Sequence, residues 1–257
     1  MARHETVLQV EIQGPVALLT MNRPQKRNAM NDALLAALDG FFSAPPEGVR
    51  VAVLSGSAGH FCAGLDLSEH AARSAEETLH HSRNWHRVMD RIQLGGLPVV
   101  SALSGAVIGG GLELAAATHV RIAEPSAVFQ LPEGRRGIFV GGGATVRIGR
   151  IIGADRLCEM MLTGRRLDAA EGLALGLAHY PAEPGAAPGR ALALARDIAA
   201  NAPLSNYLII QAVGRIDDMS RSDGLFAESL AAALAQSGPD AAEGLRAFLE
   251  KREPRFR

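Results

Sequence analysis

The sequence predicts an α/β fold with a helical tail, and three observations support that class. Predicted strands and helices alternate from the N-terminus to about residue 200, which is the pattern of a sheet covered by helices. A strand, a Ser-Gly pair, a turn and a Gly-Leu-acid-Leu string occur twice, 47 to 49 residues apart. Such a period indicates stacked supersecondary units, each packing on the previous one. From Pro203 onward the pattern is helical only.

The N-terminal elements follow from β-rich runs and a capping residue. The runs 7–13 and 15–21 flank a Gly-Pro turn and predict a β-hairpin. Asn31 or Asp32 can accept a hydrogen bond from the first free N–H groups of a helix that ends near Phe42. Further strands, rich in β-branched and apolar residues, are expected at 49–54, 99–103, 119–123 and 127–131.

The remaining segments predict helices. The polar segment 68–93 is compatible with a helix, and an Ala/Leu-rich amphipathic run covers 224–236. The segment 181–189 is rich in Pro, Ala and Gly, so it is the predicted boundary between two parts of the chain. Shorter helices are expected at 112–118, 143–152, 154–162, 168–175 and 190–201.

Composition argues against several classes of protein. The net charge of −1 provides no basic field that would bind nucleic acid or an anionic membrane. Cys62 and Cys158 are the only cysteines, which rules out a disulfide framework and leaves a single disulfide open. The N-terminal residues do not have the pattern of a signal peptide, and no uncharged apolar run is long enough for a transmembrane helix. We therefore expect a cytoplasmic protein with neither a nucleic-acid nor a membrane partner.

Two glutamates, each in a glycine-marked turn, carry the strongest functional signal. Glu113 follows a predicted buried strand and three successive glycines, Gly109 to Gly111, at the start of a predicted helix. Glycines leave backbone N–H groups open to a ligand, and the first turn of a helix adds free donors and partial positive charge. Glu133 lies in the string Phe-Gln-Leu-Pro-Glu-Gly. A carboxylate beside such donors favours a site where an oxygen gains negative charge while a proton moves.

Plain structural interpretations compete with the functional ones. A glutamate in the first turn of a helix usually complements the dipole, and Glu133 could be a solvated loop acid. The glycines could serve close packing or cradle a phosphate, but no Gly-Lys-Ser/Thr string of a nucleotide-binding loop is present. Asp66 is expected to cap a helix, and Cys62 to be a small buried hydrophobe. Solvated or pocket-lining positions, in preference to metal ligation, are expected for His80, His81, His86 and Trp85.

Five short motifs, each weak alone, are specific in their order and spacing. They are Asn22-Arg23-Pro24 with Asn28-Ala29, the string Phe-Cys-Ala-Gly-Leu-Asp-Leu at 61–67, Gly-Gly-Gly-Leu-Glu-Leu-Ala at 109–115, Leu131-Pro132-Glu133, and Leu162-Thr163-Gly164. With these motifs the chain resembles the crotonase superfamily, also called the enoyl-CoA hydratase/isomerase family, over nearly its whole length.

The resemblance implies a spiral of ββα units with a C-terminal helical region used for trimerisation. Residues 1–200 would form the spiral core that binds acyl-coenzyme A, and residues 201–257 the oligomerisation region. A homotrimer, often doubled to a homohexamer, is therefore expected. An oxyanion hole is expected from the backbone N–H groups of Leu65 and Gly110, which lie in the two turns of the internal repeat.

The same resemblance assigns the other site residues. Glu113 and Glu133 are the expected catalytic pair, acting on an acyl-CoA thioester. Coenzyme A belongs to the substrate, and no metal or separate cofactor is expected. Residues expected to bind coenzyme A are Arg27, Ala29, Ala63, Leu65, Asp66, Leu67, Phe248 and Lys251, the last two often across a subunit boundary.

Retention of both glutamates favours an enoyl-CoA hydratase. One carboxyl group can take a proton from water while the other delivers a proton to the α-carbon, and like charges at close range keep one of them protonated. An enoyl-CoA isomerase or a hydratase-lyase of the superfamily is the alternative. A dehalogenase is excluded because Gly141 stands where its aspartate nucleophile would be. A non-catalytic or RNA-binding member ranks last, since the chain has few lysines.

Three stretches depart from the family's pattern. They are Thr118-His119, the glycine-rich stretch 140–145, and the segment 68–95, where acyl specificity usually resides. None removes a catalytic group, but together they leave the pocket shape, the acyl chain and the pathway undetermined.

Overall fold

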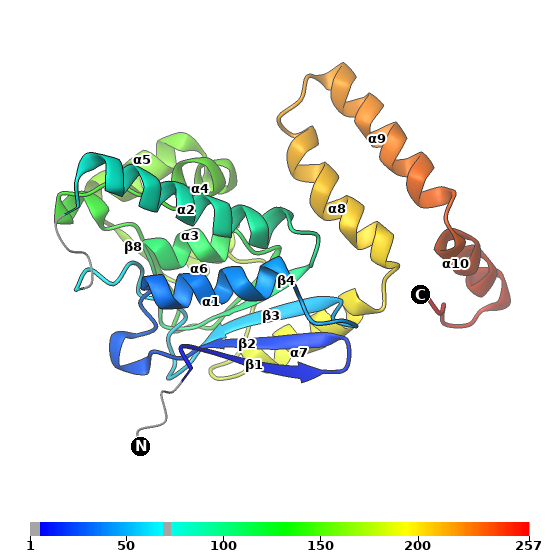
Figure 1. The fold of residues 1–257 in the computed structure, drawn as a ribbon, viewed down its shortest axis with the longest axis horizontal. Coiled ribbons are helices and arrows are strands. Elements are labelled where there is room, and N and C mark those ends of the chain that lie inside the picture. Colours follow the sequence, from blue (N-terminus) through cyan, green and yellow to red (C-terminus); the bar gives the residue numbers. More distant parts are fainter. Residues whose placement is uncertain (1–5, 69–72, 257) are drawn as a thin grey trace.

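The computed structural model describes residues 6–68 and 73–256, and its body is built on two β-sheets (Figure 1). The N-terminal hairpin is confirmed, because β1 (Leu8–Gln13) and β2 (Val16–Met21) pair antiparallel. Among the described residues the larger sheet has six strands in the order β1-β2-β3-β4-β6-β9, parallel after the first pair. Its other strands are β3 (Val51–Gly56), β4 (Val99–Leu103), β6 (Val120–Ala123) and β9 (Tyr180–Pro181).

The chain alternates between this sheet and a smaller one. Within the described ranges the smaller sheet has the order β5-β7-β8, and Cys62 extends it through a parallel bridge to Val107. Because β4 leads into β5 and β6 leads into β7, successive units stack as the predicted spiral. The register pairs Ala52 with Val99, 47 positions later, which is the offset of the sequence repeat. The strands of this sheet are β5 (Ala106–Ile108), β7 (Val128–Gln130) and β8 (Arg166–Leu167).

Helices cover both faces of the larger sheet. Successive residues of a strand point to opposite faces, so Val51 and Val53 face helix α7 while Ala52 and Leu54 join the main core on the other side. Helix α7 (Ala187–Ala199) meets the sheet with a stripe of small residues, namely Ala187, Ala191, Ala195 and Ala199. The main core lies between the sheets and the first helices, where the site is also found.

Most helices of the body begin within two residues of their predicted starts, but α2 begins at Ala75 and not at the expected 68. Asn31 caps α1, since its side chain accepts a hydrogen bond from the N–H of Leu34 at 3.0 Å. Ser74 and Glu77 form a capping box at the start of α2. The body contains α1 (Asp32–Ser43), α2 (Ala75–Leu94), α3 (Gly110–Ala116), α4 (Ala144–Ile152), α5 (Ala154–Thr163) and α6 (Ala169–Ala174), with 3₁₀ helices η1 (Pro24–Lys26) and η2 (Glu133–Arg136).

The boundary predicted at 181–189 is wrong. This segment joins β9 to α7, and both of these elements belong to the larger sheet and its covering layer. Pro188 lies in the first turn of α7, where proline is tolerated because that N–H has no partner within the helix. The composition therefore marked a helix start inside the body, and α7 begins three residues earlier than the expected 190.

The chain leaves the body after α7 and continues as an arm of three helices, α8 (Pro203–Ile216), α9 (Arg221–Gln236) and α10 (Pro239–Glu250). Figure 1 shows α9 and α10 standing away from the sheets, while α8 lies nearer to them. Gln211 of α8 donates a hydrogen bond to the carbonyl of Leu94, at the end of α2. The division of the chain at residue 200 and an oligomerisation role for 201–257 stay predictions.

Candidate active site

The two glycine-marked turns of the sequence repeat lie side by side. The Cys62 N–H donates to the Ala106 carbonyl at 2.8 Å, and the Ile108 N–H donates to the Cys62 carbonyl at 3.1 Å. A Cβ atom built on Gly64 would lie 3.3 Å from the Gly110 nitrogen, and one built on Gly110 would lie 3.5 Å from the Leu65 nitrogen. The backbone nitrogens named from the sequence are therefore neighbours.

Glycine is required at this junction for both space and backbone conformation. Gly64 and Gly109 have φ values of +94° and +54°, which side chains rarely tolerate. A Cβ on Gly64 would come within 2.7 Å of the Ile108 carbonyl oxygen. Within the described part of the chain, the N–H groups of Leu65 and Gly110 have no intramolecular acceptor. Two adjacent free donors of this kind can bind one oxygen that gains negative charge.

Glu113 lies in the first turn of α3 and is only 3% exposed. Its Oε1 accepts hydrogen bonds from the N–H groups of Gly142 at 2.8 Å and Ala144 at 3.0 Å. Burial raises the pKa of this carboxyl, while the two N–H groups and the charge of Arg147 oppose the rise. Glu113 is thus held by a second segment of the chain, which a residue that only complements the helix dipole would not need.

Glu133 is the first residue of η2 and is 7% exposed, so it is not a solvated loop acid. Its Oε2 is buried and has no hydrogen-bond partner among the described residues. Burial raises the pKa of Glu133 to about 7, with the nearby charge of Glu113 acting in the same direction and its own backbone N–H opposing the rise. A carboxyl group with such a pKa is partly protonated near neutral pH and can donate a proton.

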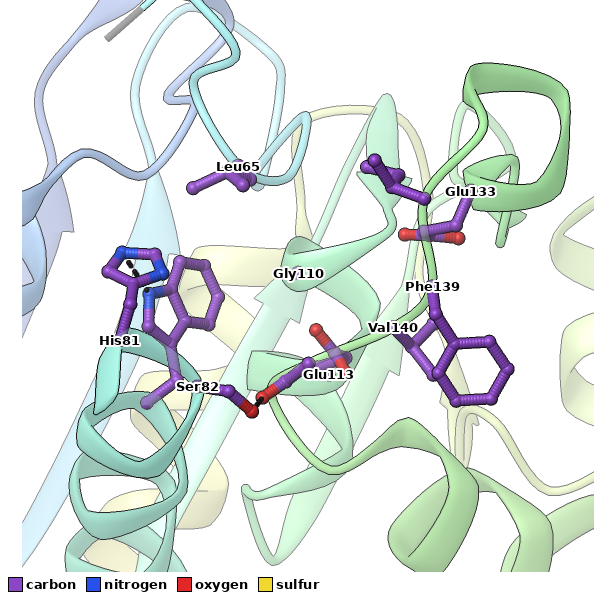
Figure 2. A pocket seen from close by; sticks show the side chains of 11 residues that line it. Leu65, His81, Ser82, Gly110, Glu113, Glu133, Phe139 and Val140 are labelled. Carbon is purple, nitrogen blue, oxygen red and sulfur yellow. Dashed lines mark hydrogen bonds between the residues drawn. The ribbon is translucent and has the colours of Figure 1, made fainter. Parts of the chain in front are cut away.

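Both carboxyl groups line one pocket with the two amides. Figure 2 shows Glu113 and Glu133 reaching it from different elements, with His81 on the opposite side. Its volume is about 70 Å³. A Cβ on Gly110 would come within 2.7 Å of the Trp85 ring, so this ring packs directly beneath the amide. The lining residues are Leu65, His81, Ser82, Trp85, Gly110, Glu113, Glu133, Ile138, Phe139, Val140 and Gly141.

The histidines of α2 form no metal site. Among the described residues no three His, Cys, Asp or Glu side chains are grouped to hold a metal ion. His81 lines the pocket, lies 3.2 Å from Asp32 Oδ1, and has the Trp85 indole N–H 3.3 Å away. His80 is exposed. The pocket-lining position is therefore confirmed for His81 and Trp85 and the solvated position for His80, whereas His86 is half-buried and does not line the pocket.

The coenzyme A residues expected in the body lie in segments that backbone hydrogen bonds join together. The Ala63 N–H donates to the Arg27 carbonyl at 3.0 Å, and the N–H of Met30 donates to the Gly64 carbonyl at 2.7 Å. Arg27 is in the left-handed region, with φ of +50°, so the turn 27–29 is tightly bent. Hydrogen bonds thus bring Arg27, Ala29, Ala63, Leu65, Asp66 and Leu67 into one region beside the oxyanion amides. Their role in binding stays a prediction.

The helix cap expected of Asp66 would fall on residues 69–72, which lie outside the described residues. The Asp66 carboxylate is buried, pairs with Arg23 Nη2 at 2.8 Å, and accepts from the Ser68 hydroxyl at 2.7 Å. Ser68 and Arg23 lower the pKa of Asp66 to about 2. Asn22-Arg23-Pro24 and 61–67 are therefore linked by a buried ion pair. Cys62 is a small buried hydrophobe, as expected, and burial raises the pKa of its thiol to about 12.

Phe248 and Lys251 are not brought to the pocket of their own chain. Phe248 is on α10 and is 79% exposed, and Lys251 follows that helix in the left-handed conformation. Neither lines the pocket, and Figure 1 shows α10 far from α3. The expected contact of these two residues with coenzyme A across a subunit boundary stays a prediction.

Several residues at and around the pocket could not be predicted from the sequence. The amides of Gly142 and Ala144 bind Glu113, and Ser82 donates a hydrogen bond to the Gly141 carbonyl at 2.7 Å. The glycine-rich stretch 140–145 departs from the family's pattern in the sequence. Its contact with Glu113, however, joins residues about thirty positions apart. Periodicity and local motifs carry no information on such a pairing.

Comparisons with known proteins agree with this fold. The family model described as enoyl-CoA hydratase/isomerase matches residues 11–257, and the chain belongs to this family, the crotonase superfamily. The predicted fold class is confirmed. A crystal structure of an enoyl-CoA hydratase candidate from Rhodopseudomonas palustris CGA009 is 51% identical, with a TM-score of 0.93 and coverage of 95% of both chains.

Curated relatives carry related names at lower identity. Enoyl-CoA hydratase domain-containing protein 2, mitochondrial, of Bos taurus is 37% identical over 94% of this chain and 84% of its own length. Enoyl-CoA hydratase EchA19 of Mycobacterium tuberculosis is 32% identical over 96% of this chain and 95% of its own.

In the described ranges, no helix is both long and apolar enough to cross a membrane.

Proposed function

We propose that the protein is an enoyl-CoA hydratase that adds water across the double bond of a 2-enoyl-CoA thioester. The observation that carries the proposal is one pocket lined by two buried carboxyl groups and by Leu65 and Gly110, whose N–H groups have no acceptor among the described residues. The thioester oxygen would bind these N–H groups, which stabilise the enolate that forms during addition.

The environments of the two carboxyl groups assign their roles. Two backbone hydrogen bonds and the charge of Arg147 favour the ionised form of Glu113, so we assign it the role of base. Glu133 has a buried oxygen without a partner and a pKa of about 7, so it is the better acid. Glu113 takes a proton as the water oxygen bonds to the β-carbon, and Glu133 gives its proton to the α-carbon. Exchange with solvent then restores both groups.

Coenzyme A is proposed to bind along Arg27, Ala29, Ala63, Asp66 and Leu67, with Phe248 and Lys251 supplied by another subunit. Both proton transfers use carboxyl groups, so the proposed reaction requires neither a metal nor a redox cofactor. Dialysis against a chelator is expected to leave the activity unchanged, and loss that returns with metal would contradict this part. A cytoplasmic location, and the lack of nucleic-acid and membrane partners, remain expectations from the sequence.

The direct test is the product formed from crotonyl-CoA and from a panel of other enoyl-CoA thioesters. A hydratase yields the 3-hydroxyacyl thioester and incorporates oxygen from labelled water. An isomerase moves the double bond without oxygen incorporation, and a hydratase-lyase releases an aldehyde. If the isolated protein forms no hydrated product from any member of the panel, the proposal is wrong. The panel also determines the acyl group.

A further inference from the structure

The base, Glu113, is held by a loop that is itself held by a buried arginine. Arg147 of α4 is 8% exposed, and its Nη1 donates to the Gly142 carbonyl at 3.0 Å. The amide of the same residue, Gly142, donates to Glu113 Oε1 at 2.8 Å. One glycine therefore links the guanidinium to the carboxylate through its two backbone groups.

Two further contacts fix the guanidinium against α2. Nε donates to Gln93 Oε1 at 2.6 Å, and Nη2 pairs with Asp90. The three directions of the planar group are thus used at once, toward Gln93, Asp90 and the loop. Ser82, about two turns before Asp90 and three before Gln93 on α2, holds the loop at Gly141.

Close contacts at Gly142 and Gly143 restrict the conformation of the loop between Arg147 and Glu113. Gly143 has φ of +107°, and a Cβ there would come within 2.1 Å of Arg147 Nη1. A Cβ on Gly142 would come within 2.7 Å of Glu113 Oε2. The glycine run lets the loop backbone pass between the guanidinium and the carboxylate.

We infer that Arg147 is a positioning residue for catalysis, which sets the orientation and the ionisation of Glu113 through the backbone of Gly142. The inference rests on the proposed role of Glu113 as the base. Besides Arg147, the titratable groups that face Glu113 are Glu133 of η2 and, across the pocket, His81 of α2. Of these only Arg147 has a fixed positive charge, and it lowers the pKa of Glu113.

Three variants separate the charge of Arg147 from its geometry. Arg147→Met removes both, so we expect kcat to fall about a hundredfold with little change in KM. Its acid limb in the pH profile of kcat/KM should move to higher pH, because Glu113 loses the nearby charge. Arg147→Lys keeps the charge but not the three-way contact, so its acid limb should stay near that of the wild type while kcat falls about tenfold. Arg150→Met is the matched control, since Arg150 lies on the same helix and pairs with exposed Asp218.

Hydrogen exchange supplies a readout independent of turnover. The amide protons of 138–145 should exchange faster in both Arg147 variants and at the wild-type rate in Arg150→Met. A folded Arg147→Met protein with kcat within about twofold of wild type would overturn the inference. A loss of activity with unchanged acid limb and unchanged exchange would overturn it too, because it would mark a purely structural arginine. Should the wild type hydrate no thioester, the proposed function falls, while the exchange experiment still decides whether Arg147 holds the loop.

Discussion

The body and the C-terminal arm differ in how much of their large apolar side chains they bury. In the body, Leu54, Met89 and Leu103 are fully buried, and even the carboxyl of Glu113 is enclosed. The arm leaves large apolar side chains exposed along its helices, among them Ile209, Val213, Leu225, Leu230, Leu234 and Phe248. The body buries its core and builds the pocket with its own residues, whereas the arm has apolar faces that its own chain does not cover.

This difference separates two requirements of the proposed enzyme. The groups proposed for chemistry come from β-turns and short helices of the body, within one chain. The arm carries Phe248 and Lys251, which are proposed to complete the coenzyme A site of a neighbour. An exposed apolar face on every arm is what a symmetric assembly would cover, and a trimer or hexamer is the proposed form.

Loss of either carboxyl group should have the largest effect and tests whether chemistry resides in the body. Glu113→Gln and Glu133→Gln should each lower kcat by about 10²–10⁴, since each removes a positioned acid or base. Thioester binding should survive in an equilibrium titration. Glu228→Gln, an exposed position on α9, serves as the control in the arm and should keep the wild-type rate. Wild-type turnover by either pocket variant would refute the pairing of the two acids.

A smaller loss is expected when one oxyanion donor is disturbed. Gly110→Ala places a methyl group against the Trp85 ring and 3.5 Å from the Leu65 nitrogen. Displacing a donor from the developing charge should lower kcat/KM by about 10²–10³. Gly149→Ala on α4, whose added Cβ would make an ordinary 3.5 Å contact with Leu157, is the matched control. Equal activity of both variants in steady-state assays would remove the amide of Gly110 from the mechanism.

Charges on the arm should break association without unfolding the body. Leu230 and Leu234 are exposed and share one face of α9, so Leu230→Glu with Leu234→Glu costs little within one chain. If that face is buried between subunits, association should weaken by about 10²-fold or more, because each leucine contributes about 1.5–3 kcal/mol. Sedimentation should then show less of the species near three or six times 27.0 kDa, and activity should fall on dilution.

Ala232 lies on the opposite side of α9, so Ala232→Glu is the control for the arm experiment. It should leave the mass of the assembly unchanged. A wild-type protein that is fully active as a monomer at micromolar concentration would contradict the proposed role of the arm. It would also remove the reason to place Lys251 at a shared site.

The pH dependence of stability gives the smallest effect and probes the body alone. The pKa of Glu133 is raised from 4.5 to about 7, so between these values the unfolded chain loses a proton that the folded chain keeps. Relative to Glu133→Gln, the unfolding free energy of the wild type should therefore fall by about 1–3 kcal/mol across this range and level off above it. Denaturant titrations from pH 4 to 8 measure the difference, and a difference independent of pH would show that Glu133 is not perturbed.

The sequence by itself determined the local elements and the residues of the two turns. β-branched runs, the Asn31 cap and glycine punctuation are short-range signals, so strands, helices and the turns around Leu65 and Gly110 could be predicted closely. The repeat also predicted stacked units, and neighbouring strands of these units do pair, with Ala52 opposite Val99. The segment 181–189 misled because proline and glycine mark a helix start as readily as a boundary.

Tertiary structure alone decided what surrounds each functional group. That Asp66 would pair with Arg23 depends on a contact between residues 43 positions apart. That Glu113 would accept hydrogen bonds from Gly142 and Ala144 depends on where α4 packs. Burial and nearby charge set a carboxyl pKa, and both arise only when distant segments meet. The sequence therefore named the two acids, while the packing of the spiral gave them the different surroundings on which their proposed roles as base and acid rest.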